Sequence, residues 1–295
     1  MVRKRDVAVR VLDFAAMYPT IFCLQRLDKL LTAPEIKAKV VTAEIKPLVG
    51  QMASDSALLF EPRTWTKLNC LVLMGPQWAV LPARMKDHES DPYTIAVAPI
   101  NTREGRWYTL ADVLAALLLG GPAPTIRRAI RFTPAGRHPA KTVRFRDAVE
   151  LRSNGPFFKT IVEQRQIAKQ GRKENRDLAA LEAGLKQLAA GGAYGIYAEI
   201  NVQPAKSDDQ LPGEVYADIA YPSKKVHDER PGAFTNPVIA SLVTGGARLM
   251  LALLERDVAQ RGGTFAFSIR IASQSPAVIA MPKSRACLKP RSRRS

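Results

Sequence analysis

The sequence feature that most restricts the fold is a long apolar segment that begins at Asn236-Pro237 and ends at Gly262-Gly263. Asparagine is a preferred helix N-cap, proline fits the first helical turn, and glycine commonly follows the last turn. Between these limits apolar residues recur at helical spacing and form one wide face: Val238, Ile239, Leu242, Val243, Leu249, Met250, Leu253 and Leu254. The pattern therefore predicts a long buried helix.

A short strand is predicted near the start of the chain. The segment Val7–Asp13 alternates valines with other residues, which places the valines on one face of a strand. Pro19 interrupts this pattern, and a helical stretch is predicted from near Thr20. Residues 35–60 are also predicted to be helical, and a further strand is predicted to begin in the segment 264–267.

Residues 61–150 are richer in proline, glycine and tryptophan, and we assign them to an insertion in the first domain. Leu71–Met74 and Ala79–Leu81 flank Gly75-Pro76, a pattern that resembles a β-hairpin. The segment from Tyr108 to Leu119 predicts a short helix, which two glycines and a proline terminate.

A helical hairpin is predicted over residues 156–190. Proline at its start suits a first turn, and a polar break at residues 171–177 divides it into two antiparallel helices. Arg165 and Lys169 are four residues apart in the first helix and so share a face. The second helix carries Lys186.

Asp13 is the first candidate for chemistry. A carboxylate at the end of an apolar strand is held rigidly at the edge of a sheet, and Mg²⁺ is commonly bound by one or two carboxylates plus substrate phosphates. The alternative is an aspartate that ends the strand and caps the next turn, and spacing alone favours that alternative.

Two further groups of residues are candidates for binding a nucleotide. Arg165, Lys169 and Lys186 would form a triphosphate clamp if they faced one another across the hairpin, whereas a solvated basic helix face is the commoner explanation of such residues. Gly191–Gly195 would allow close approach of a ligand, with Tyr194 stacking on a base. The end of a helix followed by a packed tyrosine explains the same pattern.

The charge of the chain favours a polyanionic partner. Lysine and arginine outnumber aspartate and glutamate by 44 to 27, a formal net charge of +17. Nucleic acid is the first candidate, because neutralised phosphates release counterions; a solvated basic surface or an anionic membrane surface are the alternatives. Since no apolar run long enough for a membrane span and no signal-peptide core stands out, we expect no membrane partner and a cytoplasmic location.

The three cysteines lie far apart in the sequence, and the three histidines are isolated. This spacing predicts neither a disulfide framework nor a zinc site. A metal site would therefore have to be built from carboxylates, which suit hard cations such as Mg²⁺.

The order of these groups resembles the family B DNA polymerases. Asp13-Phe-Ala-Ala-Met-Tyr-Pro-Thr-Ile21 is similar to their first motif, an Asp followed by Ser-Leu-Tyr-Pro-Ser-Ile. Lys186 to Gly195 is similar to their second motif, a Lys followed by an Asn-Ser turn and Tyr-Gly, and residues 163–169 stand where the family has its first fingers helix. The second motif departs from the family pattern, because Ala190 replaces the usual Asn and one extra residue separates Lys186 from Tyr194.

The resemblance implies an α+β fold with a polymerase palm, an antiparallel sheet with packed helices, plus fingers made of a helical hairpin. Residues 1–60 would form the first part of the palm and residues 61–150 an insertion in it. Residues 151–193 would form the fingers and residues 194–267 the second part of the palm. Residues 268–295 would be an aberrant or disordered basic tail.

The resemblance also implies the role of each site residue in adding deoxynucleotides to a primer on template DNA. Asp13 would bind two catalytic Mg²⁺ ions and serve, with Lys186, as a catalytic residue, the lysine giving a proton to the leaving pyrophosphate. The carbonyl of Phe14 would support the nucleotide-bound metal. The remaining nucleotide-binding residues would hold the phosphates, the sugar and the base of a deoxynucleoside triphosphate: Ala16, Met17, Tyr18, Arg165, Lys169, Lys186, Tyr194 and Gly195.

The family places its other metal ligands in a third motif, Asp-Thr-Asp-Ser, on a hairpin after the long helix. In this sequence Phe267 leads up to that point, and Ser268–Ser275 follows; no aspartate or glutamate occurs from Val258 onward. We therefore expect a chain that lacks this motif, a proofreading domain and a thumb, and that is weak or inactive as a polymerase. A short basic tail that binds nucleic acid is the alternative explanation.

A frameshift would explain the missing motif. If Ser268–Ser275 is encoded TCG ATA CGG ATA GCC TCG CAA TCG, translation from the third base gives Asp-Thr-Asp-Ser-Leu-Ala-Ile. The codons are our choice, so the nucleotide sequence after the codon for Phe267 tests this hypothesis. Codons that exclude Asp-Thr-Asp-Ser in the shifted frame would contradict it.

Overall fold

The long apolar segment forms helix α8, Pro237–Gln260, as predicted. Asn236 caps this helix, because its side-chain oxygen accepts a hydrogen bond of 3.1 Å from the backbone N–H of Ile239. A neighbouring strand approaches α8 closely at Gly245, where a Cβ atom would lie only 2.1 Å from the hydroxyl oxygen of Thr109. The helix therefore lies in the core, with its buried face supplied mainly by leucine, alanine and glycine.

The computed structural model describes residues 9–14, 16–85, 94–136, 139–204, 210–215, 219–224, 227–263, 267–269 and 278–282. Helices and strands both contribute, and every strand pair within these residues is antiparallel. The predicted α+β class is therefore confirmed.

Helix α8 is long and apolar enough to cross a bilayer by length and composition. The sequence-based expectation that no segment reaches this length is therefore wrong. Half of the apolar window in α8 is buried inside the protein, and a core helix of a folded domain has the same composition.

A four-stranded sheet packs on one side of the core. Its order is β2-β7-β3-β6, with β2 at Glu35–Val40, β3 at Cys70–Met74, β6 at Trp107–Thr109 and β7 at Ile126–Ala135. Alternate residues of β3 are buried, and they join one apolar cluster with helices α3, Thr42–Ser54, and α5, Leu110–Leu118. Short elements cover this cluster: η1 at Ser56–Phe60 and α4 at Pro62–Trp65.

Two predictions in this region are wrong. Residues 35–40 form strand β2 rather than helix, because their backbone pairs with β7 over the whole length of the strand. The hairpin about Gly75-Pro76 does not form either, since β3 pairs with β6 and β7, whereas β4, Trp78–Met85, pairs with β5, Thr94–Asn101. The predicted helix from Tyr108 begins at Leu110, after strand β6.

The predicted helical hairpin is present. Helix α6 spans Phe157–Gly171 and helix α7 spans Arg176–Ala193. Their inner faces join a second apolar cluster with five short elements and with the start of α8. These elements are α1 at Met17–Leu24, α2 at Leu27–Leu31, β8 at Thr142–Phe145, β9 at Val149–Arg152 and η2 at Gly195–Tyr197.

Residues near the two ends of the chain form a small sheet of order β1-β15-β14. Strand β1 spans Val9–Asp13, β14 spans Phe267–Ile269 and β15 spans Val278–Pro282. The last two strands lie almost wholly in the segment predicted to be aberrant or disordered. Within that segment residues 268–269 and 278–282 have paired backbones, and the rest of the predicted tail lies outside the described residues.

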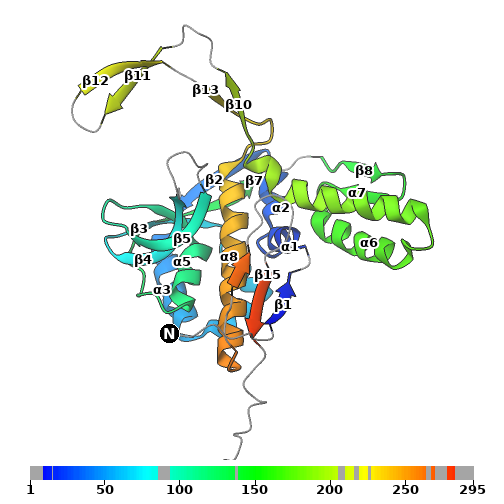
Figure 1. Cartoon of the computed structure of the whole chain (residues 1–295), viewed down its shortest axis with the longest axis horizontal. Helices are drawn as coiled ribbons and strands as arrows, with labels where there is room; N and C mark the ends of the chain where they lie inside the picture. The colour runs from blue at the N-terminus through cyan, green and yellow to red at the C-terminus, as the bar shows by residue number, and fades with distance from the viewer. Residues whose placement is uncertain are drawn as a thin grey trace, which may run out of the picture.

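A projecting arm between η2 and α8 has no counterpart in the predictions. It consists of two strand pairs, β10 with β13 and β11 with β12, which span Ile200–Pro204, His227–Pro231, Gln210–Val215 and Ile219–Lys224. Figure 1 shows this arm extending away from the body of the protein. The same view shows α8 in the middle, with α6 and α7 on one side and β3, β4 and α5 on the other.

Candidate functional site

Asp13 is the last residue of strand β1, as the sequence predicted. Its backbone pairs with Val278 in the central strand β15, and Ile269 at the end of β14 pairs with the same valine. Asp13 and the end of β14 therefore lie at the same end of the three-stranded sheet. The side chain of Asp13 lies outside the described part of the structure, so the predicted metal contact stays a prediction.

The chain turns sharply between β1 and α1. Ala16 has φ 55° and ψ 45°, the left-handed region, and its carbonyl accepts the hydrogen bond from the N–H of Thr20 that begins α1. A residue with a Cβ atom in this conformation costs roughly 1–2 kcal/mol. Pro19 in the first turn sacrifices no helical hydrogen bond. The residue with the left-handed backbone, Ala16, is thus one of the two residues, with Met17, that were predicted to bind phosphate.

The two tyrosines of the predicted site meet. The rings of Tyr18 and Tyr194 are stacked, with centroids 5.0 Å apart and planes inclined by 30°. Tyr18 lies in the first turn of α1, and Tyr194 follows the last residue of α7. The structure therefore brings the two motif segments together, although they are far apart in the sequence.

A buried aromatic group beneath these tyrosines fixes α1 against the hairpin. Phe22 of α1 is fully buried. The centroid of its ring lies 4.6 Å from the ring centroid of Phe158 in α6 and 5.8 Å from that of Tyr197 in η2. Burial raises the pKa of the Tyr197 hydroxyl to about 12. These apolar contacts connect α1, α6 and η2, three of the elements that carry predicted nucleotide-binding residues.

The predicted clamp of three cations is only partly present. The Nε atom of Arg165 donates a hydrogen bond of 2.9 Å to Oε1 of Glu182, and Nη1 of Arg172 lies 3.2 Å from Oε2 of the same carboxylate. Glu182 is buried, and its hydrogen bond from Arg165 lowers the pKa of its carboxyl. One edge of the Arg165 guanidinium group is thus occupied by the buried carboxylate of Glu182.

Lys169 and Lys186 are exposed, and neither has a hydrogen bond or ion pair within the described residues. Because Arg165 faces Glu182 across the antiparallel pair, Lys186 lies about one turn nearer the base of the hairpin and Lys169 about one turn nearer its tip. The two lysines are therefore about 12 Å apart along the helix axes. Arg165 and Lys186 can share one ligand, but Lys169 lies farther out than predicted.

The described part of the protein holds no ready-made group of metal-binding side chains. No three histidine, cysteine, aspartate or glutamate side chains gather there. The predicted donors reduce to one carboxylate at Asp13 and the backbone carbonyl of Phe14. This set fits one Mg²⁺ ion carried by a triphosphate, but it does not fit a pair of protein-bound ions.

Sequence reasoning missed Glu182 as a site residue. Its signal was available, because Glu182 shares a helical stripe with Leu185 and Ala189, which are buried. A carboxylate on an apolar stripe predicts a buried cationic partner.

Comparisons of the chain with protein-family models, with curated proteins and with solved structures found no match. The resemblance to family B DNA polymerases therefore stays a prediction from the quoted motifs. The site is argued below from its own geometry.

Proposed function

We propose that this chain is the palm and fingers region of a family B DNA polymerase, which binds deoxynucleoside triphosphates and primer-template DNA. As an isolated chain it would be weak or inactive in template-directed synthesis. The stacking of Tyr18 on Tyr194 carries this proposal, since it joins the segments that resemble the first and second polymerase motifs.

The surroundings of the two tyrosines support a nucleotide site. A Cβ atom at Gly195 would meet nothing within 4 Å, so there is open space beside Tyr194. The N-terminus of α1 lies at the other ring, and helix N-termini favour phosphate. A base could therefore approach the aromatic pair while its phosphates face α1 and the hairpin.

The cations of α6 and α7 would act in different ways. Lys186 is exposed and unpaired in the described structure, so it is available as a point charge and a proton donor for phosphate. The Nε–H of Arg165 is donated to Glu182, but the guanidinium group has further N–H donors. Glu182 would thus fix the orientation of Arg165 while its other N–H groups contact the triphosphate.

The carboxylate count explains the expected weakness. A bound Mg²⁺ ion would neutralise charge on the triphosphate, and Asp13 with the Phe14 carbonyl would hold it. Polymerases clamp both the attacking and the leaving oxygen with two ions, and the motif resemblance assigns only the carboxylate of Asp13 to this purpose. The chain is therefore better equipped to bind a nucleotide than to transfer it.

A basic nucleic-acid-binding protein without catalysis is the second candidate. The observation that favours it is the presence of exposed arginines on strands β7, β8 and β9: Arg127, Arg128, Arg144 and Arg152, the last paired with Glu150. Such a surface would bind DNA through phosphates and weaken steeply with salt.

A primer-extension assay with Mg²⁺, combined with a DNA-binding measurement, separates these candidates. We expect little or no extension. We expect the chain to bind primer-template DNA, and the next correct deoxynucleotide should tighten that binding. In the Asp13→Ala variant the nucleotide should no longer affect the affinity for DNA. Salt-sensitive binding that ignores both the nucleotide and Asp13 would favour the second candidate. Robust extension that Asp13→Ala abolishes would contradict the expected weakness.

A further inference from the structure

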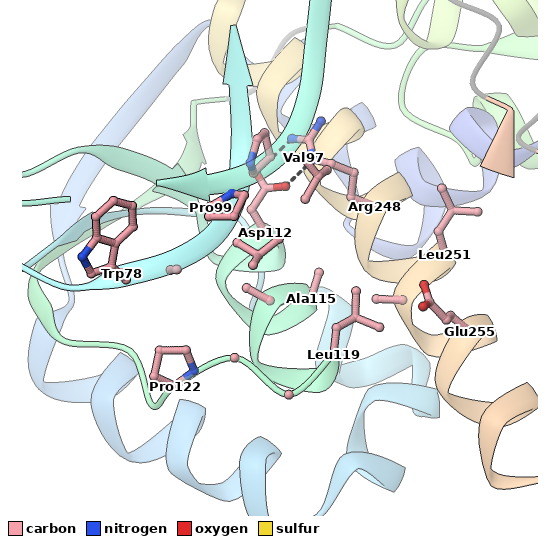
Figure 2. Close-up of a pocket in the computed structure, with 17 residues that line it drawn as sticks. Trp78, Val97, Pro99, Asp112, Ala115, Leu119, Pro122, Arg248, Leu251 and Glu255 are labelled. Atoms are coloured by element: carbon pink, nitrogen blue, oxygen red, sulfur yellow. Dashed lines mark hydrogen bonds and ion pairs between the residues drawn. The ribbon is translucent and has the colours of Figure 1, made fainter. Parts of the chain in front are cut away.

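A pocket of about 540 Å³ lies between the β4–β5 strand pair, helix α5 and the C-terminal half of α8. Figure 2 shows Trp78 and Pro99 on one side of it, Leu119 and Pro122 at its lower edge, and Leu251 and Glu255 on the α8 side. None of its lining residues belongs to the segments that resemble polymerase motifs. It is therefore a separate site.

The walls of this pocket are mostly apolar, and several wall residues are unusually exposed. Trp78 is 64% exposed, Val97 51% and Leu119 49%. Ligand sites in proteins are typically concave, of 300–1,000 Å³, and apolar with a few placed polar groups. The size and lining of this pocket are those of a site for a small organic molecule.

Three charged residues line the pocket, and two of them neutralise each other. Asp112 and Arg248 form a two-pronged ion pair, seen at the top of Figure 2, with 2.9 Å between Nη2 and Oδ2. Glu255 lies two turns farther along the same face of α8 and has no ion pair or hydrogen bond within the described residues. Burial raises the pKa of its carboxyl. When ionised, Glu255 is therefore the one lining residue whose charge has no counter-ion within the described part of the structure.

We propose that this pocket binds a small organic cation, an ammonium or guanidinium group on an apolar or aromatic body. The cationic group would pair with the carboxylate of Glu255. The apolar body would cover Trp78, Val97 and Leu251, and an aromatic face such as that of Trp78 also attracts cations.

The charge of the ligand follows from the contrast between this pocket and the rest of the protein. With a net charge of +17, the protein gives an anionic ligand many places to bind and no reason to select this one. An uncharged apolar ligand would fill the cavity but leave the half-buried Glu255 carboxylate desolvated and unpaired, which is unfavourable. A cationic ligand with an apolar body would fill the cavity and pair with the carboxylate.

Isothermal titration of the full chain with three matched probes tests the proposal. The probes are 2-(1-naphthyl)ethylamine, 2-(1-naphthyl)ethanol and 1-naphthylacetate, which share an aromatic body and differ in charge. We expect the amine to bind about fivefold more tightly than the alcohol, the magnitude of a partly exposed ion pair, and the acetate more weakly than both.

Two variants and a control locate the binding. Glu255→Gln keeps the size of the side chain and should remove the preference for the amine, and Trp78→Leu should weaken both the amine and the alcohol. Glu61→Gln changes an exposed carboxylate outside the pocket and should leave all three affinities unchanged. Equal binding of the three probes, no binding of the amine, or an amine preference that persists in Glu255→Gln would overturn the proposal.

Discussion

Replacing Arg248 with alanine is expected to lower the free energy of unfolding by about 3–5 kcal/mol, because it leaves a buried carboxylate without its cation. The side chain of Asp112 is only 3% exposed, and that of Arg248 is 12% exposed. Asp112 also accepts a hydrogen bond of 2.8 Å from the hydroxyl of Thr109, the N-cap of α5. The ion pair therefore joins α5, its cap and α8, and its loss would be a large share of a typical domain stability.

Urea unfolding of matched variants measures this effect. Arg261→Ala removes a second arginine of the α8 region, whose ion pair with Asp257 is exposed, and should change stability by less than about 0.5 kcal/mol. The double variant Asp112→Leu with Arg248→Met removes both charges and should recover much of the loss. A loss below about 1 kcal/mol in Arg248→Ala would show that Asp112 is not held as described.

Replacing Phe22 with alanine is expected to cost about 3–5 kcal/mol through the cavity that it leaves. Phe22 is fully buried between Phe158 and Tyr197, so its ring connects α1 with the hairpin and with η2. The loss should also appear locally. Amide protons of α6 and α7 should exchange faster, because those helices lose their contact with α1.

The matched control is Phe60→Ala, which removes the same side chain from a position that is 63% exposed. It should cost less than about 1 kcal/mol and should leave exchange in the hairpin unchanged. Similar losses for both variants would contradict the assignment of Phe22 to the core. An unchanged exchange rate in Phe22→Ala would show that α1 does not support the hairpin.

Elements with local signals were predictable from the sequence. Helix α8 begins at Asn236 because the asparagine side chain caps the first turn. Helix α7 begins in the same way at Asn175, whose side chain accepts hydrogen bonds of 2.8 and 3.2 Å from the backbone amides of Asp177 and Leu178. The capping residue and the apolar periodicity of each helix lie next to each other in the sequence. One short segment therefore contains all the information needed to predict the helix.

Strands that depend on distant partners were not predictable. Residues 35–40 have no strong local preference, and they are extended because β7, far along the chain, pairs with them. The chain bends at Pro76, but the hydrogen bonds there go to distant residues: the N–H of Gly75 donates to the carbonyl of Thr125, and Gln77 bonds to Thr102. A local turn signal cannot specify which strands it separates.

In the candidate site too, some features could be predicted from the sequence and others could not. The motif residues could be listed from the sequence, and the stacking of Tyr18 on Tyr194 brings two of them together. The commitment of Arg165 to Glu182 was not predictable from spacing, since it depends on which faces of α6 and α7 meet. The distance between Lys169 and Lys186 follows from the same register.

The most direct test of the proposed site is the equilibrium binding of a deoxynucleoside triphosphate to the full chain with Mg²⁺, measured by calorimetry. We predict that dATP binds, that ATP binds more weakly, and that Lys186→Ala weakens dATP about tenfold or more, the magnitude of a lost charge-assisted hydrogen bond. Lys173→Ala, an exposed lysine at the tip of the hairpin, should change nothing. If dATP does not bind, or if Lys186→Ala binds it as well as the unaltered chain does, the proposed nucleotide site is wrong.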